Sequence, residues 1–103
     1  MLINLTPHTV TVGSVVIKPT EPAARVSSTT TVVGVIAFDD FEIEIIETHY
    51  GQVENLPEPN GKDSFIVSRM VKDRVPERND VLVPGELVRD EEGRIVGCKN
   101  LSL

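Results

Sequence analysis

The sequence predicts a mainly β domain of the α+β class, a compact antiparallel barrel or sandwich-like domain of about eight short strands with one short helix near residues 69–75. Hydrophobic residues make up 40% of the chain and are mostly Val, Ile and Leu, and β-branched side chains favour strands. Apolar and polar residues alternate in several short runs that Gly, Pro and Asp residues separate. A chain of 103 residues has room for one core, so we expect a single domain over residues 1–103.

The first third of the chain predicts short strands joined by tight turns. Residues 3–8 read as a strand that ends in a turn, because Pro7 holds Thr6 in an extended conformation and has no N–H to donate. Residues 9–12 and 15–18 flank a Gly-Ser pair and predict a β-hairpin. A loop over 19–23 then leads into strands over 24–27 and 28–33.

The segment 35–48 predicts two strands around a turn at Asp39 and Asp40. In the second strand Phe41, Ile43 and Ile45 fall on one face, whereas Glu42, Glu44 and Ile46 fall on the other. We therefore expect one face to pack in the core and the other to be solvated. Residues 51–61 hold two prolines and two glycines without periodicity, which predicts an ordered loop.

The stretch 64–76 predicts a buried strand that runs directly into the only helix. Ser68 is a favourable N-cap residue, and Val75 precedes Pro76, which limits the helix to about two turns. Residues 62–78 hold five basic and three acidic residues, whereas the whole chain holds 10 and 16. After it, residues 80–85 predict a strand, and 86–89 with 94–98 predict a second hairpin.

The junction of strand and helix suggests a site for a small anion, since the first helical turn leaves N–H groups free and carries a partial positive charge. Arginine can bind phosphate or carboxylate there through two hydrogen bonds. The alternative is that Ser68 only caps the helix and the basic side chains are solvated. The candidate ligand-binding residues are Thr6, His8, Arg25, Ser68, Arg69 and Arg78.

Several kinds of chemistry have no support in the sequence. The two histidines and Cys98 lack metal-ligand spacing, and no catalytic or cofactor motif is present, so we expect no metal, no cofactor and no enzymatic activity. One cysteine excludes an internal disulfide, which fits a reducing compartment. A net charge of −6 argues against binding a nucleic acid polymer. Because no signal peptide or membrane-length apolar run is visible, a cytoplasmic location without membrane contact is expected.

A set of motifs spans nearly the whole chain: residues 4–8 (Asn-Leu-Thr-Pro-His), 51–59, 66–68, 80–85 and 88–98. As a set they resemble a family of short bacteriophage and prophage proteins with an N-terminal Asn-Leu-Thr-Pro-His motif. The resemblance implies a phage setting and supplies no catalytic residues. The segment 38–41 is longer and more acidic than the hairpin usual in that family.

These features predict a ligand-binding protein that captures a small anionic or nucleotide-like molecule without turnover, with pockets shared between the subunits of a homo-oligomer. In a phage setting, such a protein would act as a sponge for a nucleotide-derived host immune signal. One alternative is a protein-interaction module, an inhibitor or virion accessory factor that uses a strand edge or the face of Glu42, Glu44 and Glu47. Another is a small hydrolase with His8 or His49 as general base.

Overall fold

The computed structural model describes all 103 residues and contains ten strands and one short helix. The mainly β class is therefore confirmed. The elements are β1 (Leu2–Asn4), β2 (Val10–Val12), β3 (Val15–Ile17), β4 (Arg25–Phe38), β5 (Phe41–Glu54), β6 (Ser64–Ile66), α1 (Arg69–Arg74), β7 (Val81–Pro84), β8 (Leu87–Arg89), β9 (Ile95–Cys98) and β10 (Leu101–Ser102).

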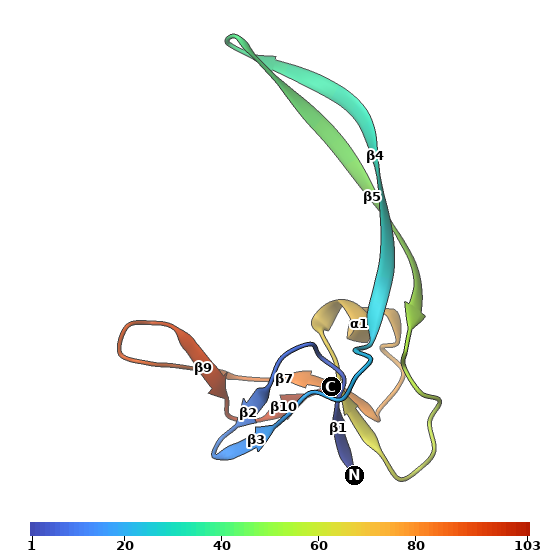
Figure 1. The fold of residues 1–103 in the computed structure, drawn as a ribbon, viewed down its shortest axis with the longest axis vertical. Helices are drawn as coiled ribbons and strands as arrows, with labels where there is room; N and C mark the ends of the chain where they lie inside the picture. Colours follow the sequence, from blue (N-terminus) through green and yellow to red (C-terminus); the bar gives the residue numbers. More distant parts are fainter.

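Two four-stranded sheets form the body, and β4 with β5 forms a separate two-stranded hairpin (Figure 1). The first sheet has the order β1-β6-β7-β10, and β6 pairs in parallel with both β1 and β7. The second has the order β3-β2-β9-β8, in which β2 and β9 are parallel. The sheets do not close into a barrel, and the parallel pairs depart from the antiparallel arrangement that we expected. Turn chemistry predicts only pairing between neighbours in sequence, whereas these pairs join distant segments.

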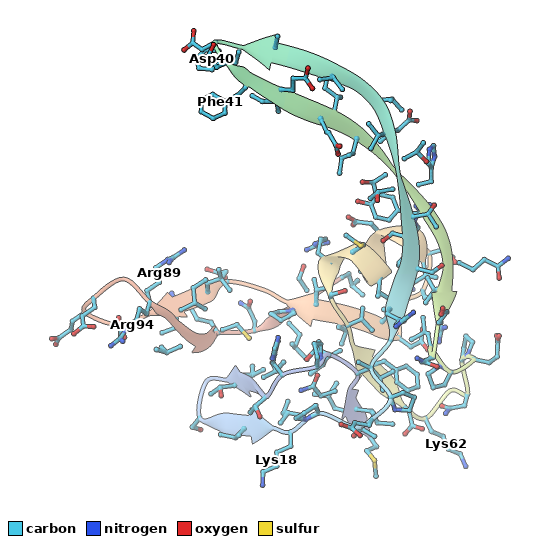
Figure 2. All side chains as sticks on the ribbon, turned by 45° about the horizontal axis from the view of Figure 1, so that its top comes forward. Lys18, Asp40, Phe41, Lys62, Arg89 and Arg94 are labelled. Atoms are coloured by element: carbon cyan, nitrogen blue, oxygen red, sulfur yellow. The ribbon has the colours of Figure 1, made fainter.

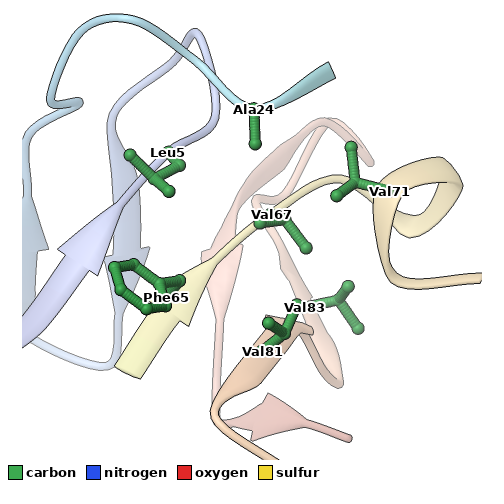
Figure 3. Packing of buried hydrophobic residues seen from close by; sticks show 7 residues of the cluster. All are labelled: Leu5, Ala24, Phe65, Val67, Val71, Val81 and Val83. Atoms are coloured by element: carbon green, nitrogen blue, oxygen red, sulfur yellow. The ribbon is translucent and has the colours of Figure 1, made fainter. Parts of the chain in front are cut away.

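The body has a small core at the junction of β6, β7 and α1 (Figure 3). Phe65 and Val67 come from β6 and the residue after it, and Val71 projects from α1. Only 12 of the 103 residues are buried, so most apolar side chains of this chain lie outside the core. The cluster comprises Leu5, Ala24, Phe65, Val67, Val71, Val81 and Val83.

The predicted helix boundaries are confirmed. Ser68 is extended (φ −69°, ψ 157°), and its hydroxyl accepts a hydrogen bond from the Val71 N–H at 3.4 Å. The helix ends at Arg74, and Val75 is the C-cap residue before Pro76. Lys72 is buried along its stem and donates from Nζ to the carbonyl oxygen of Arg78 at 2.7 Å, which ties the helix to the loop that follows.

The hairpin is longer than the sequence patterns predicted. The predicted strands over 24–27 and 28–33 and the first strand of 35–48 are one strand, β4, from Arg25 to Phe38. Its pairing with β5 is irregular between Val26 and Ser28 and between Val32 and Gly34, which accounts for the breaks in the alternation. The predicted loop 51–61 is wrong over its first four residues, since β5 continues to Glu54. The radius of gyration is 17.6 Å, whereas a compact chain of about 100 residues has about 13 Å. The molecule is therefore not compact, and the hairpin projects from the body (Figure 1).

Candidate binding surfaces

The outer half of the hairpin carries one face without any charged side chain. Residues directly opposite each other on paired strands share a face, and the pairs here are Gly34 with Ile45, Ile36 with Ile43, and Phe38 with Phe41. The strand turns back through Asp39, whose φ of 52° is a left-handed conformation that aspartate tolerates. We call Ile36, Phe38, Phe41, Ile43 and Ile45 the apolar face.

Nothing in the chain covers the apolar face. Its five side chains are 39% to 69% exposed, with Ile45 the least and Phe41 the most accessible. The predicted alternation of faces is confirmed, but the prediction that this face packs in the core is wrong. The reason is geometric, because the hairpin leaves the body and no second layer lies over it (Figure 2). Phe41 lies at the far end, beside Asp40 in the turn (Figure 2).

The other face of the same half holds carboxylates between apolar residues. Val35 pairs with Glu44 and Ala37 with Glu42, so these four residues point away from the apolar face. Residues 25–54 contain one arginine and six carboxylates, a net charge of −5, so the hairpin carries nearly all of the net charge of −6. The expected solvated carboxylate face is confirmed for Glu42 and Glu44, whereas Glu47 lies on the opposite side of β5.

A basic groove lies where the base of the hairpin meets the helix. Tyr50, Arg69, Met70, Asp73 and Arg74 line it. The Arg74 guanidinium lies 5.3 Å from the centre of the Tyr50 ring, in a cation–π arrangement. Two arginines against one aspartate give the groove a net positive charge in an acidic chain. An aromatic ring beside two guanidinium groups can bind a flat, anionic ligand.

Thr6 has a structural role in a polar network under the N-terminal turn. It is buried, and its Oγ1 lies 2.7 Å from Asn4 Oδ1 and 2.8 Å from the carbonyl oxygen of His8. The buried Asn4 side chain donates in turn to the carbonyl oxygens of His8 and Ile17. The network fixes the turn at Pro7, while the His8 side chain is exposed.

Arg25 and Arg78 are both engaged with carboxylates. Arg25 lies 3.7 Å from Glu54 across the base of the hairpin. Arg78 makes two hydrogen bonds to Asp80, from Nε at 3.0 Å and from Nη2 at 2.7 Å. These hydrogen bonds lower the pKa of Asp80 and raise the pKa of Arg78.

The six predicted residues do not gather at one site. Arg69 lines the basic groove, whereas Arg78 lines a separate polar hollow with Lys62 and Glu77. Ser68 caps the helix, and Thr6 lies in the polar network with Asn4 under the N-terminal turn. No group of three or more His, Cys, Asp or Glu side chains is placed to hold a metal ion.

Comparisons with protein-family models, curated proteins and solved structures found no match. The phage resemblance therefore stays a prediction. No helix in the structure has the length and apolar character needed to cross a membrane.

The apolar face and the basic groove differ from the predicted site, and the sequence signals only one of them. Tyr50 and Arg74 lie 24 positions apart, and only the packing of β5 near α1 brings them together. The apolar face had a visible signal, because residues 32–46 hold many large apolar side chains for a domain of this size. The alternation of apolar and polar residues does not show whether the apolar face of a strand packs against the same chain or against another chain.

Proposed function

We propose that this protein is a protein-interaction module that binds through the projecting β4–β5 hairpin. The uncovered apolar face is the observation that carries this proposal. An isolated two-stranded hairpin is at most marginally stable in water, and contiguous exposed apolar surface typically marks an interaction site. A partner that covers this face would bury the rings of Phe38 and Phe41, and aromatic side chains dominate the energetics of interfaces.

The carboxylates of the hairpin fit this role. Glu42 and Glu44 lie among exposed apolar residues of the second face and disfavour its burial, so only one side of the outer hairpin is free of charge. Charged residues on an exposed hairpin also oppose indiscriminate association between strands. The proposal therefore places the contact on the apolar face and differs from the expectation that Glu42, Glu44 and Glu47 make it.

Photo-crosslinking tests this function. Benzoylphenylalanine at Phe41 should give a discrete adduct with a protein in producing cells, whose mass identifies a second copy or another chain. The matched control places the probe at Val16, which is 60% exposed on β3 in the body. A crosslinking yield at Phe41 that is no higher than the yield at Val16 would overturn the proposal.

A second candidate function is the binding of a small anionic, nucleotide-like ligand in the basic groove. The observation that favours it is the Tyr50 ring beside Arg74, with Arg69 on the same groove. A ring face and two cations suit a base and a phosphate. With the phage resemblance, this candidate takes the form of a sponge in the host cytoplasm that sequesters a nucleotide-derived immune signal, with subunits that share pockets.

Calorimetry and thermal shifts with cyclic and ADP-ribose-type nucleotides test the second candidate. Loss of one charge-assisted hydrogen bond of about 1.5–3 kcal/mol should weaken affinity roughly ten- to a hundredfold, so we expect that loss for Arg69→Ala and for Arg74→Ala. Arg89→Ala is the matched control, because Arg89 lies on the β8–β9 arm away from α1 (Figure 2). Chromatography should recover the ligand uncleaved. A blank panel, or equal losses in all three variants, would exclude the groove.

A further inference from the structure

We propose that the partner of the apolar face is a second copy of this chain, and that two hairpins pair face to face in a homodimer. This inference rests on the proposed function and names the partner of the same surface. The five residues of the apolar face lie on both strands of one hairpin around the Ile36–Ile43 pair. A two-fold axis near that pair would place the apolar face of one copy against the identical face of the second copy.

The charge distribution favours a second copy on this face. None of the five residues of the apolar face is charged, so two copies of this face meet without like charges between them, and the nearest carboxylate on this side of β5 is Glu47, two positions beyond Ile45. The side chains of Glu42 and Glu44 point to the other face and stay in water when the apolar faces pair. Association through the opposite faces would instead bring four carboxylates together.

The available area is sufficient for a small specific interface. A free side chain of this size exposes about 200 Å², so five side chains at 39% to 69% exposure offer roughly 500 Å² in each copy. The pair would then bury at most about 1,000 Å², which is the size of weak, transient interfaces. Because interfaces of this size are typical of weak, transient association, we expect a dimer dissociation constant on the order of 1–100 μM.

Sedimentation equilibrium on the full chain tests the dimer. At about 100 μM the weight-average mass of wild type should lie between about 1.5 and 2 times the chain mass, and it should fall toward the chain mass on dilution. Ile43→Lys should weaken dimerisation at least tenfold, because it places a charge at the centre of the apolar face. Val35→Lys is the matched control, since Val35 is a β-branched residue of similar exposure (55% against 51%) on the opposite face, opposite Glu44.

A thiol crosslink keeps the test valid if the lysine variant unfolds. Cys98 is buried, so Ile43→Cys supplies the one accessible thiol, and Val35→Cys supplies it on the other face. A short bis-maleimide should join two Ile43→Cys chains efficiently and two Val35→Cys chains poorly. A monomeric wild type, or equal behaviour of the two positions, overturns the second-copy inference. A Phe41 adduct with a different protein would still support the proposed function.

Discussion

Phe38 and Phe41 lie directly opposite each other at the tip of the hairpin, and both rings are about two-thirds exposed, at 64% and 69%. Cross-strand aromatic pairs stabilise a hairpin by about 0.2–1 kcal/mol, which is little for two rings left in water. Contact of the two rings with a binding partner would account for their exposure. The pair then acts as an anchor at the far end of an arm of 14 residues in each strand.

Replacing both tip rings should remove apolar surface without unfolding the body. At chain concentrations below the dimer dissociation constant, we expect Phe38→Thr with Phe41→Thr to lower binding of the dye ANS at least twofold and to change the free energy of unfolding by less than about 1 kcal/mol. Val15→Thr with Val16→Thr on β3 is the control, because it removes two exposed apolar residues of the body that point to opposite faces of their strand. Equal losses of dye binding in both variants would contradict a special role of the tip.

The ion pair of Arg78 and Asp80 should stabilise the body more than the exposed pairs of Arg94. Their side chains are only 13% and 22% exposed, and two hydrogen bonds join them. Arg78→Ala should cost about 1.5–3 kcal/mol in urea unfolding, because it leaves the Asp80 carboxylate without its partner. Arg94→Ala, which breaks exposed pairs with Asp90 and Glu92, should cost about 0.2–1 kcal/mol. Equal costs would show that burial does not strengthen the Arg78 pair.

Acid should remove the contribution of Asp80. Hydrogen bonds from Arg78 hold its pKa below the ordinary value, although burial opposes this shift. Because the folded pKa lies below the unfolded value of about 3.9, the carboxylate stabilises the fold above that pH and loses this effect as pH falls through the folded pKa. The difference in unfolding free energy between wild type and Asp80→Asn should therefore be largest at pH 7 and shrink below about pH 4. A difference that is unchanged at about pH 3 would show that it does not arise from ionisation.

Local chemistry predicted the elements whose signals lie within a few residues. The turns at Gly13 and Asp39 and the Ser68 cap were found because each needs a residue type at one position, and Gly13 indeed has a positive φ of 59°. The helix ended where Pro76 required it to end. These features depend on the backbone of their own segment.

Pairing between distant segments and the surroundings of each face were not predictable in this way. The parallel pair of β1 and β6 joins Ile3 to Phe65, and no turn signal records that separation. The alternation correctly predicted that Phe41, Ile43 and Ile45 share one face of the strand. A period of two carries no information on what covers that face. The basic groove was partly anticipated through Arg69, whereas Tyr50 enters it only through tertiary packing.

The N-cap of the helix should contribute to stability independently of any ligand. Ser68→Ala removes the acceptor for the Val71 N–H and should cost about 0.5–1 kcal/mol, at the lower end because this hydrogen bond is long at 3.4 Å. Ser68→Asp should restore stability, since aspartate is also a favourable cap and its charge suits the start of a helix. Urea unfolding with and without a nucleotide separates the roles. A loss of ligand affinity in Ser68→Ala with stability unchanged would assign Ser68 to binding instead of capping.

Salt should strengthen the dimer. Each hairpin carries a net charge of −5, so two hairpins side by side repel each other through carboxylates that lie outside the five residues of the apolar face. At about 0.5 M salt the Debye length falls to roughly 4 Å, which screens this repulsion and leaves the apolar contact in place. We expect the dimer dissociation constant to fall several-fold between about 0.05 and 0.5 M NaCl in sedimentation experiments. The variant Glu42→Gln with Glu44→Gln should show a tighter dimer at low salt and a weaker salt response. Dissociation of the wild-type dimer by salt would mean that ion pairs hold the two copies together and would contradict the apolar contact.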